Sequence, residues 1–266
     1  MASPVLNDKA FERGLDESQA GWAAPDTAMA TQAAPPAAAR GEKTMTANGT
    51  FARAFALFLL VLAGGAFGWQ QVDVTSANQI DIPGWSWVVL IAAFAAAMVC
   101  AFVPKVSPFL GPVYALLEGV FLGIISKAFE LRWDGIVLQA ILATVAVFFV
   151  TLILYVTGVV KVTRRFTMVV IGATLGILLM YAVTWIATIF GADLTFWNQP
   201  SALGIGITIV IAGVAALNLF LDYEFIRRAS IAGAPSYMEW YGAFGLMVTL
   251  VWLYLEMLRL LSLLRQ

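Results

Sequence analysis

The stretch GIVLQAILATVAVFFVTLILYVT (residues 135–157) contains no charged side chain. A helix needs about 20 mainly apolar residues to cross about 30 Å of hydrocarbon, so this stretch predicts a membrane-spanning helix. Six similar segments accompany it, joined by short connections that carry Gly, Pro or charge. The seven predicted spans are 51–69, 85–103, 109–129, 135–157, 167–190, 202–222 and 240–264. The sequence therefore predicts an all-α polytopic membrane protein with seven transmembrane helices.

The overall composition supports the membrane assignment and excludes several other classes of function. The 266 residues are 61% hydrophobic and 12% charged, whereas soluble domains are about 45–50% apolar and about 25% charged. A net charge of −1 argues against a nucleic-acid partner. Cys100 is the single cysteine and there is no histidine, which removes disulfides, thiolate metal clusters and Ser-His or Cys-His catalysis. We expect no enzymatic activity, no cofactor and no firmly bound metal.

The N-terminal region differs from the rest of the chain. Between Ala20 and Ala39 it is rich in Ala, Pro, Thr and Gln and has almost no large aliphatic side chains. Such a composition buries too little surface to offset chain entropy. We therefore predict a disordered cytosolic tail over 1–50, followed by a transmembrane domain over 51–266.

The distribution of basic residues predicts the orientation in the membrane. If the N-terminus is cytoplasmic, eleven Lys and Arg residues lie on the cytoplasmic side and four lie on the outer side. We expect a multi-pass protein of the plasma membrane with its N-terminus inside and its C-terminus outside. If the last segment re-entered the membrane without crossing it, the C-terminus would lie inside.

Glycines recur four residues apart at three places in the predicted spans. The pairs are Gly64/Gly68, Gly119/Gly123 and Gly172/Gly176. Because this spacing permits close approach of membrane helices, we interpret the pairs as packing contacts within the bundle.

Several strings make the chain recognisable. Three strings resemble the Bax inhibitor/YccA family, also called the TMBIM family: GPVYALLEGVFLGIISKAFE (111–130), LNLFLDYEFIRR (217–228) and WYGAFGLMVTLVWLYLEMLRLLSLL (240–264). MTANGTFARAFALFLL (45–60) is similar to its actinobacterial branch. The resemblance implies six helices around a central C-terminal helix, in a bacterial inner membrane. It also implies a calcium leak or a pH-responsive cation function, and a link to a membrane protease.

The family signature is a pair of aspartates in the sixth and seventh helices that share a proton and gate the pore. By resemblance, Asp222 in FLDYEFI matches the first. For the second, one alignment selects Glu256 and another selects the neighbourhood of Val248. Glu256 is 16 residues beyond Trp240, about 24 Å along a helix, so direct contact with Asp222 at the inner end of the sixth helix is not expected.

The remaining ionisable residues of the spans each allow two interpretations. Glu118 either shares a proton or cation with Asp222, or is a protonated or hydrogen-bonded structural residue. Asp222 itself either belongs to this site or pairs with Arg227 or Arg228. Glu256 has Arg259 at i+3, the spacing of an intrahelical ion pair, and we favour that structural role.

Two other residues complete the candidate set. Lys105 matches a basic residue near the family's inner gate in position, but it also fits a cytoplasmic anchor. Cys100 is expected to be a small packing residue.

Two functions are expected from the resemblance together with these residues. The first is a pH-sensitive cation leak, with Ca²⁺ or H⁺ as the moving ion, gated by the carboxylates of Asp222 and Glu118. The alternative is a regulator without transport of its own, which binds another membrane protein, such as a membrane protease, through its N-terminal tail. In either case the lipid bilayer is a partner.

Overall fold

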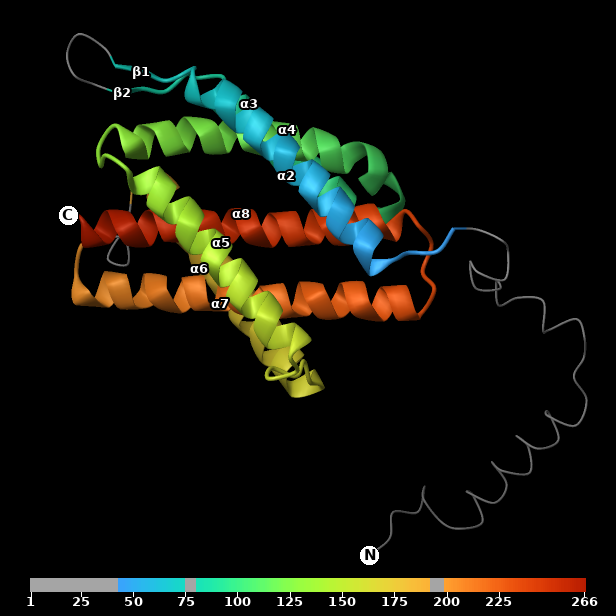
Figure 1. Ribbon diagram of the computed structural model, residues 1–266. Helices are drawn as coiled ribbons and strands as arrows, with labels where there is room; N and C mark the ends of the chain where they lie inside the picture. The colour runs from blue at the N-terminus through green and yellow to red at the C-terminus, as the bar shows by residue number, and fades with distance from the viewer. Residues whose placement is uncertain (1–42, 75–79, 192–198) are drawn as a thin grey trace, which may run out of the picture. The chain divides into compact units, whose positions relative to one another are not determined.

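The computed structural model describes residues 43–74, 80–191 and 199–266. Contacts along the chain separate two units, Met1–Glu42 and Lys43–Gln266. The first unit, which holds most of the predicted tail, lies outside the described residues. The second unit contains the helices of Figure 1. Residues 43–50, assigned to the tail from the sequence, belong to this second unit.

The second unit is a helical bundle with one short hairpin. The elements are α2 (Ala47–Trp69), β1 (Asp73–Val74), β2 (Ile80–Asp81), α3 (Ser86–Phe102), the 3₁₀ turn η2 (Pro104–Val106), α4 (Ser107–Glu130), α5 (Ile136–Val156), α6 (Arg164–Ile189), α7 (Ala202–Ile231) and α8 (Met238–Leu264). β1 and β2 pair antiparallel through two residues each. The predicted all-α polytopic architecture is confirmed.

Six of the described helices are long and apolar enough to cross a membrane. The predicted span 85–103 corresponds to α3, which is apolar but has only 17 residues. It ends at Phe102, and Pro104 begins the 3₁₀ turn that leads into α4. Because proline lacks a backbone donor and disfavours helical backbone before it, the break falls at this point.

The predicted end of the sixth span was wrong because charged residues do not end a helix. α7 continues for nine residues beyond the predicted end at Asp222 and stops at Ile231. Within this extension Arg227 and Arg228 form ion pairs with Glu224 at spacings of i+3 and i+4. At the other end of the chain, α2 begins at Ala47, with the Thr46 side chain accepting a hydrogen bond from the Gly49 amide.

The bundle is organised around α8, which is the most buried of the six long helices. α8 packs against α2, α4, α5 and α7, and it lies between α4 and α7 (Figure 1). It is one uninterrupted helix of 27 residues, about 40 Å long, so it is long enough to span and contains no re-entrant break. We call the side where α2 begins the N face and the side where α8 ends the C face.

Glycines set the closest helix contact, between α2 and α4. A Cβ atom on Gly64 or Gly68 would collide with backbone atoms of Leu116 or Val120, and one on Gly119 would collide with Val61. Gly123 is equally close to the backbone of Gly65. The prediction of packing within the bundle is confirmed for these two pairs. It is wrong for Gly172/Gly176, whose Cβ positions on α6 have no neighbour within 4 Å.

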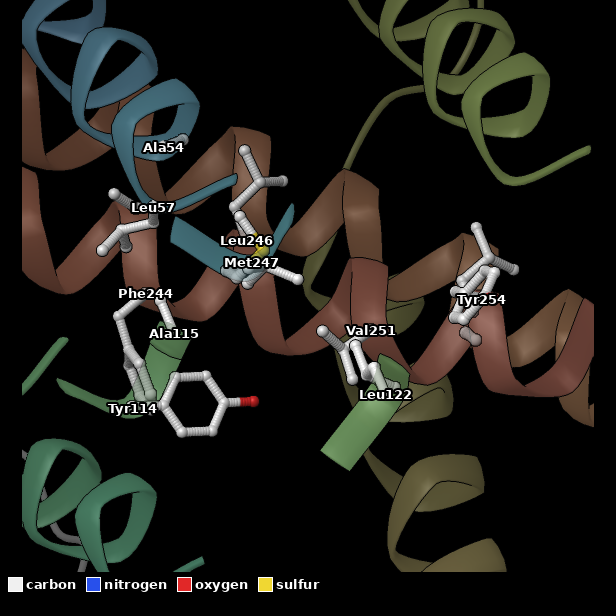
Figure 2. Close-up of a cluster of buried hydrophobic side chains, with 14 of the residues drawn as sticks. Ala54, Leu57, Tyr114, Ala115, Leu122, Phe244, Leu246, Met247, Val251 and Tyr254 are labelled. Atoms are coloured by element: carbon white, nitrogen blue, oxygen red, sulfur yellow. The ribbon is translucent and has the colours of Figure 1, made fainter. Parts of the chain in front are cut away.

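The core lies where α2 and α4 meet α8. The Tyr114 ring packs edge-on against Phe244, with centroids 5.2 Å apart and planes at 78°. Leu57 and Ala115 are fully buried beside this pair (Figure 2). Cys100 is also fully buried, as its predicted packing role requires. These contacts fix the depth of α4 relative to α8.

Candidate functional site

Asp222 faces α8 from within α7. Its Oδ1 atom lies 3.8 Å from the position that a Cβ on Gly245 would occupy, and Thr249, whose hydroxyl donates to the Gly245 carbonyl at 3.2 Å, lies one turn further along α8. Its Oδ2 atom is buried and has no hydrogen-bond partner among the described residues. A buried polar atom without a partner is costly, so this oxygen is poised to hold a proton or a cation.

Asp222 meets α8 near Val248, one of the two positions that the sequence offered for the second acid. Gly245 and Thr249 flank Val248 on α8, which the sequence indicated as the level of the second acid. Here that level carries a glycine and a threonine next to Asp222. The absence of a Cβ on Gly245 leaves room beside the carboxylate, and Thr249 supplies a hydroxyl. The second acid of the family signature is therefore not next to Asp222.

Glu118 lies at a similar depth on α4. It is eleven residues from Ser107, and Asp222 is nine residues from Ile231, so the two lie about 16 Å and about 14 Å from the helix ends at the N face. Glu118 is half-buried one turn beyond Tyr114, and it forms no hydrogen bond or ion pair with a described residue. Glu118 therefore lies halfway along α4 and Asp222 lies in the N-face third of α7, and neither has a cationic partner in the described ranges.

The two carboxylates occupy different helices on either side of α8. α4 and α7 both pack on α8, which lies between them (Figure 1). No hydrogen bond within the described ranges joins Glu118 to Asp222. The interpretation of Asp222 as an interfacial partner of Arg227 or Arg228 is wrong, because Glu224 takes both arginines. Sharing of a proton or cation between Glu118 and Asp222 stays a prediction.

Glu256 belongs to a separate polar cluster towards the C face. It is buried and accepts a hydrogen bond of 2.5 Å from the Tyr181 hydroxyl on α6. Arg259 Nη1 lies 3.7 Å from Glu256 Oε2 and donates to the Tyr181 hydroxyl at 3.2 Å. The predicted i+3 ion pair is present, and no described hydrogen bond connects it to Asp222. Tyr181 could not be linked to the pair from sequence spacing, because it lies 75 residues away.

Glu224 forms an ionic network that sequence reasoning missed. Its carboxylate accepts 2.8 Å and 2.5 Å hydrogen bonds from Arg227 and Arg228, and a 2.6 Å hydrogen bond from the Tyr155 hydroxyl on α5. The network ties the N-face ends of α5 and α7 together. The i+3 and i+4 spacing of the arginines was the available signal, and it would have required extending the helix beyond Asp222.

Glu239 was also missed, and it connects three parts of the chain. It is buried at the start of α8, where Oε1 accepts 2.7 Å and 2.9 Å hydrogen bonds from the amide and hydroxyl of Thr46. Arg53 on α2 forms an ion pair with its other oxygen. Next to it, the Met45 amide donates to the Ala234 carbonyl at 2.7 Å. This N-face joint fastens the start of α2 to the turn between α7 and α8.

The remaining predicted residue, Lys105, is exposed in η2 at the N face. It forms no hydrogen bond or ion pair with a described residue, and nothing links it to Asp222. Over the described part of the chain, no group of three or more Cys, Asp or Glu side chains is arranged to hold a metal ion. A cation beside Asp222 would therefore be held by one carboxylate together with hydroxyl or backbone oxygens.

Comparison with known proteins identifies the family. A family model described as Bax inhibitor 1 like matches residues 4–266, nearly the whole chain. A search of curated proteins found no match, and neither did a search of solved structures. The matched length agrees with the sequence resemblance and with the apolar bundle around α8. The chain therefore belongs to the Bax inhibitor 1 like family and is a multi-pass integral membrane protein of that type.

Proposed function

We propose that this protein is a pH-sensitive cation leak, with Ca²⁺ or H⁺ as the moving ion, and that the Asp222 carboxylate gates it. The observation that carries the proposal is the buried Oδ2 atom of Asp222, which has no hydrogen-bond partner in the described ranges. Ionisable groups in mid-membrane are costly and are usually found at ion or proton sites. The neighbouring Gly245 and Thr249 provide space and an additional oxygen ligand.

A line of polar side chains towards the C face supports a route along α6, α7 and α8. One turn from Asp222, the Asn218 amide of α7 donates to the Thr174 hydroxyl of α6 at 2.8 Å. Further along α6, Tyr181 contacts Glu256 of α8. Protons and hard cations move between oxygen groups, so this series supplies stepping positions beyond the gate. Glu118, on the other side of α8, is the second proposed carboxylate of the gate.

Ion flux into proteoliposomes tests the proposal. Ca²⁺ entry and proton entry are measured between about pH 6 and pH 8 for the wild type, Asp222→Asn, Glu118→Gln and the double variant. We expect Asp222→Asn to reduce the pH dependence, because the amide cannot titrate. Glu224→Gln is the matched control, since it removes an acid two residues away that is already held by two arginines. Wild-type flux and pH response in the double variant would overturn the proposal.

The alternative function, a regulator of another membrane protein, has one structural observation in its favour. The chain that follows the tail is fastened at the N-face joint, through Met45 and the Thr44–Pro235 bridge, to the turn preceding α8. A partner that holds the tail would therefore act directly on the start of the central helix. Deleting 1–42, which leaves this joint intact, should abolish regulation while leaving the bundle folded. An unchanged phenotype would count against this function.

We also infer that the N face is cytoplasmic and that the membrane is the plasma membrane. Six basic residues lie on or near the N-face ends of the helices: Lys105, Lys161, Arg164, Arg165, Arg227 and Arg228. The C face carries Lys127, Arg132, Arg259 and Arg265. An excess of basic residues favours the cytoplasmic side. Labelling of single cysteines at positions 161 and 132 of a Cys100→Ala variant in intact cells tests this: only position 132 should react.

A further inference from the structure

A long apolar groove lies between α2 and α5. Its volume is about 640 Å³, and α4 and α8 form its floor. Along α2 its lining runs from Phe51, near the N face, to Trp69, at the C-face end. The floor includes Leu122, Met247, Val251 and Tyr254, which are labelled in Figure 2. This volume is within the range of about 300–1,000 Å³ that is typical of sites for small ligands.

The groove opens towards the hydrocarbon of the membrane. Its wall residues Phe55 and Leu62 on α2 and Phe149 on α5 are 62%, 47% and 53% exposed. Its floor is closed, because Leu246 and Met247 are almost completely buried. An occupant therefore enters from the membrane plane, and it must itself be apolar where it contacts these walls.

The few polar side chains in the groove already have partners. Ser126 and Tyr254 share a hydrogen bond of 2.6 Å, and the Thr144 hydroxyl donates to the Ala140 carbonyl at 2.8 Å. None of these groups requires a polar ligand to satisfy it. The interior of the groove therefore favours a plain hydrocarbon chain.

The C-face end of the groove adds a positive charge. Lys127 Nζ lies 5.0 Å from the centroid of the Trp69 ring, which lines the groove. Lys127 forms no ion pair with a described acid. At the N-face end, by contrast, Arg53 is already paired with Glu239. The unneutralised charge at one end of an apolar groove fits a ligand with a hydrocarbon tail and an anionic head.

We propose that the groove is a phospholipid-binding site. An acyl chain lies between α2 and α5, and the lipid phosphate lies beside Lys127 at the C face. A tryptophan at the membrane interface together with a lysine is suited to hold a lipid head group at this level. The site is independent of the proposed ion gate, because none of the residues lining the groove is Asp222 or Glu118.

A transmembrane helix from a partner fits the groove less well. Membrane helices approach each other through small residues, as α2 and α4 do here at their glycines. The walls of the groove instead carry Phe55, Phe58 and Phe149. These bulky side chains keep the backbone of another helix from approaching closely, whereas an acyl chain needs no such approach.

Photo-crosslinking tests the proposal. The full-length protein is placed in phosphatidylcholine vesicles that contain a trace of phosphatidylglycerol with a diazirine in one acyl chain, and labelled peptides are mapped by mass spectrometry. We expect labelling to concentrate on the α2 and α5 walls of the groove. Equal labelling of the exposed Leu179 region of α6 would show only bulk lipid contact and would overturn the proposal. In native membranes, crosslinks from the walls to another protein's helix would also overturn it.

Matched variants distinguish lipid binding in the groove from lipid contact with the rest of the surface. Leu250→Trp fills the floor and should reduce wall labelling about tenfold, whereas Val210→Trp on the exposed side of α7 should not change it. If Leu250→Trp does not fold, Ala66→Phe on the exposed wall replaces it. Unchanged labelling in a folded groove-filling variant would overturn the proposal.

The head-group part of the proposal has its own test. Each basic residue at a membrane surface is worth about 1 kcal/mol towards an anionic lipid, which is about fivefold in affinity. Lys127→Gln should therefore reduce wall labelling by phosphatidylglycerol about fivefold, while Arg132→Gln, at the same face but away from the groove, should not. Labelling by a phosphatidylcholine probe should fall less, because its choline cation offsets the charge of the phosphate. No loss with either lipid would overturn the placement of the phosphate.

Discussion

Replacing Gly119 by alanine should weaken the bundle, although alanine is the better helix former. A Cβ at this position would lie only 2.9 Å from Val61 Cα and 3.0 Å from Val61 C, and closer still to the Val61 carbonyl oxygen. These are backbone atoms of α2, so they cannot rotate away. α2 and α4 would have to move apart along the contact that Gly64, Gly68 and Gly123 also form.

The structure also provides the size of the effect and its control. Overpacking costs about 1–3 kcal/mol, and replacing a helical glycine by alanine returns about 0.5–1 kcal/mol. The net loss at Gly119 is therefore about 0–2.5 kcal/mol, with a central value of about 1 kcal/mol. At Gly172 on α6 a Cβ meets nothing within 4 Å, so Gly172→Ala should keep the gain of about 0.5–1 kcal/mol without the cost.

Thermal unfolding in detergent, followed by circular dichroism, is the assay. The two variants should differ by about 2 kcal/mol, or roughly 4–8 °C in Tm at about 2–4 °C per kcal/mol for a chain of this size. Gly119→Ala should lie below the wild type and Gly172→Ala at or above it. Equal Tm values for both variants would refute the argument that backbone contact at these glycines holds α2 against α4.

Two further predictions concern the paired carboxylates and use the same assay. Arg259→Leu should lower stability by about 3–5 kcal/mol, because it leaves Glu256 buried without its cation; a loss below 1 kcal/mol would contradict this. At the N-face joint, Glu239→Gln and Arg53→Met should each destabilise by about 1–3 kcal/mol, and the double variant should lose clearly less than the sum of the two. Additive losses would mean that the two side chains do not interact.

Hydropathy predicted most of the fold because the membrane imposes a length on each helix. α5 lies within one residue of the predicted 135–157 at each end, since Gly135 with φ 75° precedes it and the apolar run simply ends. α7 was cut short because charge was taken as the end of the helix. The end of a membrane span and the end of a helix need not fall at the same residue. Charged side chains lie outside the hydrocarbon, but backbone hydrogen bonds and i+4 ion pairs continue the helix into the interface.

In the candidate site, only contacts between two residues of the same helix could be predicted from the sequence. The spacing of Glu256 and Arg259 on α8 was enough to predict their ion pair. The Thr46–Glu239 contact joins residues 193 positions apart, and the Asp222–Gly245 contact depends on how α7 rotates against α8. Rotation of a helix about its axis changes which side chains contact the neighbouring helices, but it leaves the hydropathy of the segment unchanged. Hydropathy along the chain therefore cannot predict such contacts.

The partners of the carboxylates in these helices divide them into two kinds. Glu224, Glu239 and Glu256 are each paired with arginine, and Glu130 accepts hydrogen bonds from the amides that open α5. Removing any of these would leave a charge or a donor unsatisfied, so structure alone accounts for them. Asp222 and Glu118 have no cationic partner in the described ranges, and they add no such stabilisation to the bundle. An apolar side chain would pack there at lower cost in a membrane, so the fold does not account for these two acids, and under the proposed function they are the ones that a proton or cation would visit.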